Sequence, residues 1–356
     1  MNARWIGIVC HREGLRAARV EMTTDLVGGT LRAAVISAAC LCGLVAAGSH
    51  AMADGTGLTF VSNEKSSTIT VLDAADTVIG NFETCARPRG MHFDLDRTHL
   101  YVGCADDSII AIYDVATQKL VKRIRNIPEP ETFDLTPDGK YLYTSNEDDS
   151  EASVVDIAAG RIIASYETGP EPEGVQITAD GTRVFVASEA ANLVHVIDTV
   201  KGEVIKDIPV GNRPRRFALT PDESELWVSA ELSGIVDIID TRTLTPIDKV
   251  SFLPKGMRRE QVTPVDLVIT ADGSRAYVAL GRANHVAVVD VKTRTVLDYI
   301  LVGRRPWGLR LTADESKLYV ANGLSDDITI IDTASNTPLI SVPVGQVPYA
   351  ILIDDR

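Results

Sequence analysis

Short runs of alternating apolar and polar residues recur along the chain from residue 58 to its end, separated by turn residues. In the unit that begins at Pro172, this alternation predicts four strands, over residues 174–178, 184–187, 194–198 and 204–208. Gly181 lies in the turn after the first strand, where glycine supplies a positive φ angle. The pattern is therefore typical of a small sheet of four antiparallel strands.

Two markers indicate that this unit is repeated seven times. An Asp ends the third strand of each unit, at intervals of 41, 42, 42, 42, 50 and 42 residues: Asp73, Asp114, Asp156, Asp198, Asp240, Asp290 and Asp332. A proline precedes each first strand, at intervals of 42, 42, 42, 50, 42 and 42 residues: Pro88, Pro130, Pro172, Pro214, Pro264, Pro306 and Pro348. Both series share one longer step, so they describe the same repeat. Units of this length with four strands each predict a seven-bladed β-propeller.

The two ends of the repeat predict how the ring closes. The chain begins with the second, third and fourth strands of a blade, over residues 58–82, and it ends with only a first strand, over residues 349–353. Pairing of these segments would complete the seventh blade and remove loose sheet edges. We therefore expect one all-β propeller over residues 54–356, with the C-terminal strand paired to the N-terminal strands.

The first 53 residues do not follow the repeat. An apolar run over residues 33–47 follows Arg32, and Ala51-Met52-Ala53 offers a small-residue cleavage site. These features predict a secretory signal peptide, and hence a periplasmic protein with no membrane segment after cleavage. The alternative is an uncleaved anchor. Such a leader does not need residues 1–21, so Met22 is a second candidate start and residues 1–21 are a candidate over-extension.

The charge of the chain bears on its partners. The sequence carries 35 Lys and Arg against 49 Asp and Glu. Because the first 53 residues contain five arginines and three acidic residues, the remainder has a net charge of −16. A field of that sign disfavours nonspecific binding to nucleic acid or to anionic lipid.

Two of the five cysteines, Cys85 and Cys104, lie after residue 53. The first precedes an innermost strand, and the second ends the strand that folds back on it. An oxidising compartment permits a disulfide between them. Hairpin register alone does not bring their Cα atoms within bridging distance, so the pair is a candidate disulfide.

Several motifs resemble a known family of repeats. The segment Leu318-Tyr319-Val320-Ala321-Asn322, with variants at residues 142–146 and 277–279, resembles the repeat of the YVTN β-propellers. Segments such as Arg87-Pro88-Arg89-Gly90 and Trp307-Gly308-Leu309 look like the periplasmic propellers associated with PQQ-dependent catabolism. This resemblance implies a setting beside a PQQ-dependent dehydrogenase or a c-type cytochrome as partner. It implies no cofactor of the chain's own and no particular reaction.

Charged residues flank the marker prolines. The connection into each first strand should emerge on the same face as the loop between the second and third strands, so these residues would ring the mouth of the channel. The basic positions are Arg87, Arg89, Arg213, Arg215, Arg216 and Arg305, and the acidic positions are Glu129, Glu131, Glu171 and Glu173. Trp307, with Tyr349 in the next unit, would add a stacking surface. The alternative interpretation is ordinary solvated loop charge.

Four glutamates form a second predicted ring. Glu64, Glu147, Glu189 and Glu231 each lie nine residues before the marker Asp of their unit, so they occupy equivalent loops on that same face. They would be partners for the arginines, oxygen ligands for a cation such as Ca²⁺, or residues inherited with the repeat. No Asp-rich loop with EF-hand spacing is present, so we expect no tight metal site.

Enzyme signatures are absent from the sequence, which contains no Cys-x-x-Cys-His, no G-x-S-x-G and no Cys or His cluster with zinc spacing. We therefore expect a binding protein without catalytic residues, whose converging arginines take a small anionic molecule or a redox partner. Eight extra residues before Pro264 fall on this face and include a basic projection over residues 255–259. The alternatives are a lactonase-type hydrolase with the glutamates as base, and a haem-handling propeller with His285 as axial ligand.

Overall fold

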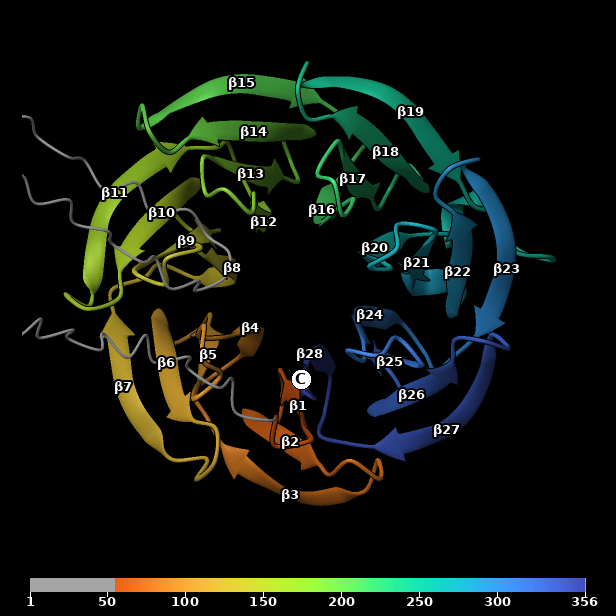
Figure 1. The fold of residues 1–356 in the computed structure, drawn as a ribbon, viewed down its shortest axis with the longest axis horizontal. Coiled ribbons are helices and arrows are strands. Elements are labelled where there is room, and N and C mark those ends of the chain that lie inside the picture. The colour runs from red at the N-terminus through yellow and green to blue at the C-terminus, as the bar shows by residue number, and fades with distance from the viewer. Residues whose placement is uncertain (1–54, 356) are drawn as a thin grey trace, which may run out of the picture. The chain divides into compact units, whose positions relative to one another are not determined.

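Each repeat folds into a four-stranded antiparallel sheet in the computed structural model, which describes residues 55–355. The seven sheets stand around a central channel as the blades of a propeller (Figure 1). In each blade the strand that begins at the marker proline is innermost, and in six of the seven blades the order across the sheet follows the order along the chain. The predicted fold class is confirmed.

We number the blades in chain order from Pro88. Blade 1 contains β4 (Pro88–Phe93), β5 (His99–Cys104), β6 (Ile109–Asp114) and β7 (Leu120–Arg125). Blade 2 contains β8 (Pro130–Leu135), β9 (Tyr141–Asn146), β10 (Glu151–Asp156) and β11 (Arg161–Glu167). Blade 3 contains β12 (Pro172–Ile177), β13 (Arg183–Ser188), β14 (Leu193–Asp198) and β15 (Glu203–Pro209).

Blades 4 to 6 repeat this plan. Blade 4 contains β16 (Pro214–Leu219), β17 (Glu225–Ala230), β18 (Ile235–Asp240) and β19 (Thr245–Ser251). Blade 5 contains β20 (Pro264–Ile269), β21 (Arg275–Leu280), β22 (His285–Asp290) and β23 (Thr295–Leu301), with the short 3₁₀ helix η2 (Gly281–Ala283) before β22. Blade 6 contains β24 (Pro306–Leu311), β25 (Lys317–Asn322), β26 (Asp327–Asp332) and β27 (Thr337–Pro343).

The seventh blade is built from both ends of the described chain. It contains β28 (Pro348–Asp354), β1 (Leu58–Asn63), β2 (Thr68–Leu72) and β3 (Val78–Glu83). β28 pairs with β1 in antiparallel register, with Phe60 opposite Leu352. At the end of β28, the Asp354 carboxylate accepts a hydrogen bond from Thr56 Oγ1 at 2.7 Å. The predicted ring closure is confirmed.

Apolar side chains fill the spaces between neighbouring blades. Middle strands such as β13 and β21 are buried over most of their length, whereas an outermost strand such as β27 is mostly exposed. The largest fully buried side chains include Trp227, Tyr277, Phe60 and Phe185. Burial of one such side chain stabilises the fold by about 1.5–3 kcal/mol, so each blade is stabilised by its neighbours on both sides.

The marker aspartates cap the turns that follow the third strands. Asp114 Oδ1 accepts a hydrogen bond from the Thr117 backbone N–H at 2.7 Å, and Asp332 Oδ1 accepts one from Ser335 at 2.7 Å. The hydrogen bonds from Thr117 hold the pKa of Asp114 below its ordinary value. The repeated Asp therefore serves the fold, because its side chain satisfies backbone donors in a tight turn.

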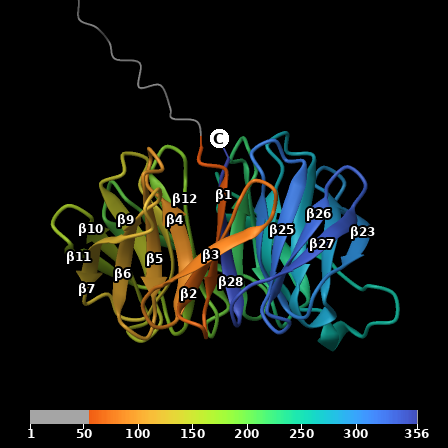
Figure 2. The same cartoon turned by 90° about the horizontal axis from the view of Figure 1, so that it is seen from below.

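One face of the ring carries the start of every innermost strand, and we call it the proline face. It also carries the loops between the second and third strands and an insertion over residues 252–263, which includes the 3₁₀ helix η1 (Arg259–Gln261). The insertion projects beyond the other loops of this face (Figure 2, teal). Its base is held by the buried side chains of Phe252 and Val262.

A disulfide joins Cys85, before β4, to Cys104, at the end of β5, with the two Cα atoms 5.7 Å apart. The bond ties the entry of blade 1 to its second strand on the proline face. The predicted signal peptide over residues 1–53 lies outside the described residues. Within residues 55–355, no helix is long and apolar enough to cross a bilayer.

Candidate functional site

Backbone hydrogen bonds bring the two predicted rings of charge together on the proline face. The N–H of Glu189 donates to the carbonyl of Glu171 at 2.8 Å. The N–H of Glu231 donates to the carbonyl of Arg213 at 2.9 Å. The residue before the proline has a positive φ angle in six blades: Arg87, Glu129, Glu171, Arg213, Arg305 and Val347. The charged side chains directly after the prolines, such as Arg215 at 4% exposure, are buried in the channel.

Glu173, on β12, lies at the centre of a cluster of buried charges. Its Oε1 lies 2.9 Å from Arg215 Nη2, 3.1 Å from Arg216 Nη2 and 3.6 Å from Arg89 Nη2. The hydroxyl of Tyr349, from blade 7, donates to the same oxygen at 3.1 Å. Burial alone would raise the pKa of Glu173, but the arginines outweigh burial and hold this pKa well below its ordinary value. Glu173 is therefore an ionised anchor for three arginines.

Arg215 extends the cluster toward blades 3, 4 and 6. Its Nη1 lies 2.7 Å from Glu189 Oε1 and 3.0 Å from Glu231 Oε2. Arg213 Nε lies 2.6 Å from Glu189 Oε2, and Arg305 Nη2 lies 3.0 Å from Glu231 Oε1. Glu189 is thus shared between two arginines, and Glu231 among three, because Arg213 Nε also lies 3.4 Å from Glu231 Oε2.

Arg87 and Arg89 extend the cluster in the other direction. Glu131 pairs with Arg89 and lies 3.2 Å from Arg87 Nη2. Arg87 also pairs with Glu129, and its Nε lies 3.4 Å from Glu64 Oε1. These contacts join blades 1, 2 and 7 to the same set of charges.

We call this set the Arg–Glu network. Its members are Arg87, Arg89, Arg213, Arg215, Arg216, Arg305, Glu64, Glu129, Glu131, Glu173, Glu189 and Glu231. The network combines six arginines with six glutamates, and half of these residues are buried. Most of the arginine charge is therefore already matched within the protein. Removing one partner of such a buried pair would leave a charge without its counterion.

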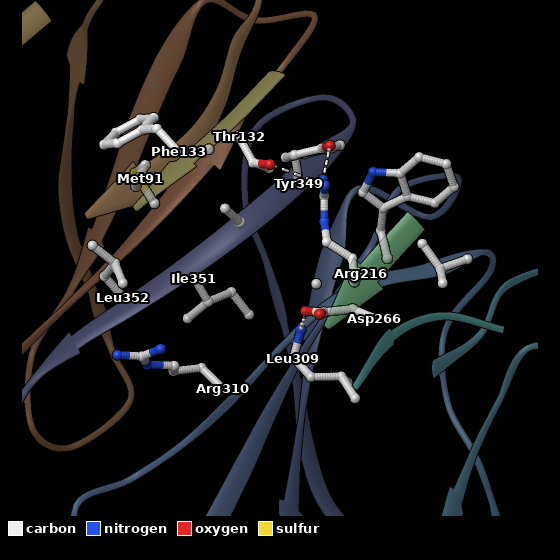
Figure 3. A pocket seen from close by; sticks show the side chains of 15 residues that line it. Met91, Thr132, Phe133, Arg216, Asp266, Leu309, Arg310, Tyr349, Ile351 and Leu352 are labelled. Carbon is white, nitrogen blue, oxygen red and sulfur yellow. Dashed lines mark hydrogen bonds between the residues drawn. The ribbon is translucent and has the colours of Figure 1, made fainter. Parts of the chain in front are cut away.

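Arg216 and Tyr349 bridge the channel from opposite sides. The Arg216 guanidinium donates to the Tyr349 hydroxyl, and the Arg89 guanidinium lies over the Tyr349 ring at 4.3 Å. A cavity of about 150 Å³ lies beside this bridge, with Thr132 and Asp266 in its lining (Figure 3). A cavity of this size holds a few water molecules and is smaller than a usual ligand pocket of about 300–1,000 Å³. This cavity alone is therefore too small for a ligand of ordinary size.

Trp307, on β24, stacks against two arginines of the network. The guanidinium carbons of Arg215 and Arg305 each lie 4.8 Å from the centre of its rings. The Trp307 and Tyr349 rings are 5.9 Å apart, so the two aromatic residues lie side by side at the channel. The indole is partly exposed and presents an apolar surface between the two guanidinium groups.

On the proline face of blades 4 to 6, several arginines lie close enough together to repel one another. Burial lowers the pKa of Arg305, and Arg282, Arg215 and Arg213 lower it further, although Glu231 opposes them. The side chains of Arg213 and Arg305 are 42% and 22% exposed. We call Arg213, Arg282 and Arg305 the basic sector. An anion bound there would relieve repulsion among these guanidinium groups.

Three glutamates of the network bind protons more tightly than usual, and burial is the main cause of the raised pKa of Glu129. Burial and the neighbouring charge of Glu173 raise the pKa of Glu189 to about 7. The same two causes, in the same order, raise the pKa of Glu131 well above its ordinary value. Strongly perturbed carboxyls beside arginines are typical of functional sites, and they also occur in structural ion-pair networks.

Two of the predicted site residues do not join the network. Glu171 is exposed and forms no ion pair with any described residue, although Arg87 and Arg213 hold the equivalent position before their prolines and do form ion pairs. Glu147 forms no ion pair within residues 55–355 either, but it lies beside Glu129 and Glu131, with ligand oxygens within 4.8 Å of one another. Arg87 already pairs with both of those neighbours and would compete with a cation there.

Some contributors were not identified from the sequence. Arg282 follows Gly281, which occupies the glutamate position of blade 5, so the repeat register would have placed it on the proline face. Thr132 and Asp266 lie two positions after their marker prolines and line the cavity. His285 Nδ1 lies 2.6 Å from the carbonyl oxygen of Ala283, and this contact does not involve Nε2.

Comparison with protein families gives two matches. The model described as a YNCE-like β-propeller matches residues 33–220, which is more than half of the chain. The model described as a lactonase, 7-bladed β-propeller, matches residues 199–348. Comparison with curated proteins gives no match.

Solved structures share the fold at low sequence identity. A hydrazine synthase from Kuenenia stuttgartiensis is 21% identical, with 74% of this chain and 88% of that chain covered and a TM-score of 0.67. A protein provisionally named a 6-phosphogluconolactonase, from Bacteroides fragilis, is 18% identical, with 84% and 98% covered and a TM-score of 0.70. The dihydro-heme d1 dehydrogenase NirN is 14% identical, with 83% and 75% covered and a TM-score of 0.63. At these identities the likeness shows the fold alone.

Proposed function

The chain belongs to the YNCE-like β-propeller family, and from this premise we propose that its proline face binds and hydrolyses a small lactone that carries a carboxylate or phosphate group. The observation that carries the proposal is the mutual repulsion of arginines in the basic sector, where Arg213, Arg215 and Arg282 all lower the pKa of Arg305. A bound anion would add negative charge to that which Glu189 and Glu231 already supply to Arg213 and Arg305. Arginine suits this role because its planar fork binds carboxylate and phosphate through two hydrogen bonds.

The surroundings of the basic sector fit a ring-shaped ligand. Trp307 lies between Arg215 and Arg305 and presents a partly exposed ring face at the channel. The apolar face of a sugar-like lactone ring would pack against the indole while its acidic group meets the arginines. The partial match to the lactonase model spans Arg213, Arg282, Arg305 and Trp307, which supports this class of substrate.

In this proposal Glu189 is the general base. Its pKa of about 7 leaves it partly ionised at neutral pH, and it lies 2.6 Å from Arg213 Nε. In the proposed step, a water oxygen attacks the lactone carbonyl carbon while Glu189 takes a proton from that water. The ring C–O bond then breaks, and the proton passes to the ring oxygen to give the hydroxy acid. Arg213 would stabilise the negative charge on the carbonyl oxygen.

A second candidate function is binding without turnover. The Glu189 side chain is only 4% exposed and both of its oxygens lie beside arginines. A base held in this way would not reach a bound lactone unless the loop moved. Binding of a small anionic molecule at the basic sector is common to both candidates.

Acid release from a panel of lactones separates the two candidates. We expect 6-phosphogluconolactone to be opened and to raise the melting temperature, and an uncharged lactone to do neither. Glu189→Gln should reduce turnover by about 100-fold or more while it keeps the melting shift. Arg213→Ala with Arg305→Ala should lose both effects. Arg242→Ala is the matched control, because Arg242 is 81% exposed in a turn away from the proline face.

The outcomes of this panel are distinct. A melting shift without turnover favours the binding function and overturns hydrolysis. If neither turnover nor a shift is seen with any anionic lactone, the basic sector is not a site for this class of ligand. Equal effects of the Arg213/Arg305 and Arg242 substitutions would also contradict the proposal. The association with PQQ-dependent oxidation, the haem-handling alternative and the periplasmic location stay predictions.

A further inference from the structure

One loop position divides the proline face into two chemically different halves. The residue that follows the glutamate position is exposed in every blade. Around the ring, from blade 1 to blade 7, it is Asp106, Asp148, Ala190, Leu232, Arg282, Leu324 and Lys65. Blades 1 and 2 are therefore acidic at this position, whereas blades 4 to 6 carry two leucines and an arginine.

Exposed leucines gather on the half formed by blades 4 to 6. Leu232 and Leu324 are 57% and 59% exposed in their loops, Leu253 is 52% exposed in the insertion, and Leu301 is 64% exposed at the end of β23. The backbone N–H groups of three of them are hydrogen-bonded. Leu232 donates to the carbonyl of Asn212 at 3.1 Å, and Leu324 donates to the carbonyl of Arg304 at 2.9 Å. Leu253 donates to the hydroxyl of Tyr299 at 2.8 Å. A fixed loop that holds a large apolar side chain in water is a feature of interaction sites.

Positive charge accompanies these leucines. Arg258 and Arg259 in the insertion, with Arg282 and Arg304, are exposed on the same half. The rest of the described chain is strongly acidic, so this half has the opposite sign to the protein as a whole. We call the four leucines and these four arginines the docking half.

We propose that the docking half binds a protein partner whose surface has an apolar centre and an acidic rim. Arginine and apolar side chains together are typical of protein interfaces, and a complementary acidic rim would orient the partner and increase its rate of association. This inference does not rest on the proposed hydrolysis, because the leucines and the insertion lie outside the Arg–Glu network.

Two other occupants fit less well. In a symmetric pair of copies that meet through the docking half, the same patch would face itself, so the arginines of one chain would oppose those of the other. An anionic membrane would attract the arginines but repel the acidic half of the same face. A separate acidic protein satisfies both the charge and the apolar surface.

Site-specific photocrosslinking of the full chain in its native host tests the proposal. A benzophenone side chain is placed at Leu253 or Leu324, and at Leu95 as the control, since Leu95 is 57% exposed in the turn after β4. We expect one protein to be crosslinked from both positions 253 and 324 and not from 95. Mass spectrometry should locate the bond in a segment rich in Asp, Glu and apolar residues.

Charge reversal then tests whether electrostatics hold the complex. Arg258→Glu with Arg304→Glu should lower the crosslink yield by about ten-fold or more, and added salt should weaken it in the same direction. Melting temperatures show whether the variants fold. If the double variant does not fold, the crosslink yield is measured with Leu324→Asp instead. A crosslink to a second copy, a crosslink to lipid alone, a basic partner segment, or a yield no higher than that from Leu95 would each overturn the proposal.

Discussion

The hydroxyl of Tyr349 donates to Glu173 Oε1 at 3.1 Å, although the two residues are 176 positions apart and lie on opposite sides of the channel. Arg216 reaches both of them, since its guanidinium donates to Tyr349 and its Nη2 lies 3.1 Å from Glu173. The ring of blades is therefore bridged from side to side by polar contacts. The stability of the closed ring and the geometry of the proline face are linked through this bridge.

Glu173→Gln should destabilise the protein strongly. The substitution leaves Arg89, Arg215 and Arg216 without the carboxylate that they share, and breaking a buried pair of this kind costs about 3–5 kcal/mol. Urea unfolding of the full chain measures the loss. Glu171→Gln is the matched control, because Glu171 is exposed two residues away, and it should change the free energy of unfolding by less than about 0.5 kcal/mol. Equal losses in the two variants would contradict the central place given to Glu173.

The Glu189 carboxyl should make stability fall as pH rises. Its pKa is raised on folding from 4.5 to about 7, so the folded state holds this proton more tightly than the unfolded state does. Its contribution is present in full below pH 4.5 and is lost as pH rises through about 7. The stability of the wild type relative to Glu189→Gln should therefore fall across this window, by at most about 1.4 kcal/mol per pH unit. A difference that stays flat or rises with pH would contradict this assignment.

Gly308→Ala should disturb both the fold and the bridge. A Cβ at Gly308 would lie 2.2 Å from the backbone oxygen of Tyr349, so β24 and β28 would have to move apart. We expect a loss of about 1–3 kcal/mol or more in the free energy of unfolding. Gly80→Ala is the control, because a Cβ there meets no atom within 4 Å. If both variants are as stable as the wild type, blades 6 and 7 do not approach each other as described.

Reduction of the Cys85–Cys104 disulfide should lower stability. The bond closes a loop with a sequence separation of 19, and a loop of this length corresponds to about 3 kcal/mol. Thiol titration of the purified protein in denaturant tests whether the bond is present. Unfolding with and without reductant then measures the loss of stability. Two free thiols from residues 85 and 104 in protein purified from an oxidising compartment would contradict the bond.

Much of the fold and part of the site follow from the repeat. The spacing of the marker prolines predicted seven blades, and the lone first strand ending in Ile353 predicted the pairing with β1. Because topology places every marker proline on one face, the convergence of Glu173 with Arg215 could also be anticipated. The choice of partners could not, since Glu171 and Glu173 flank the same proline and only Glu173 enters the channel. Arg87 and Arg213 precede their prolines with the same positive φ angle as Glu171 and do join the network, so the repeat position does not distinguish them from Glu171.

The pairing of the arginines with the glutamates could not be predicted from the sequence either. The network contains as many glutamates as arginines, so most of its arginines already have a carboxylate partner and are not all available to bind an anion. The local repulsion at Arg305 depends on Arg282, whose approach is set by the short helix η2. Only the three-dimensional arrangement separates the matched charges of Arg89 and Arg215 from the basic sector.

Titration calorimetry with 6-phosphogluconate, a ligand that the proposed hydrolysis cannot consume, tests the central claim most directly. The account predicts binding by the wild type, unchanged binding by Arg242→Ala, and a loss of about ten-fold or more in affinity when Arg213 and Arg305 are both replaced by Ala. No heat of binding in the wild type, or equal affinity in all three proteins, would contradict the claim that the basic sector of the proline face is an anion site.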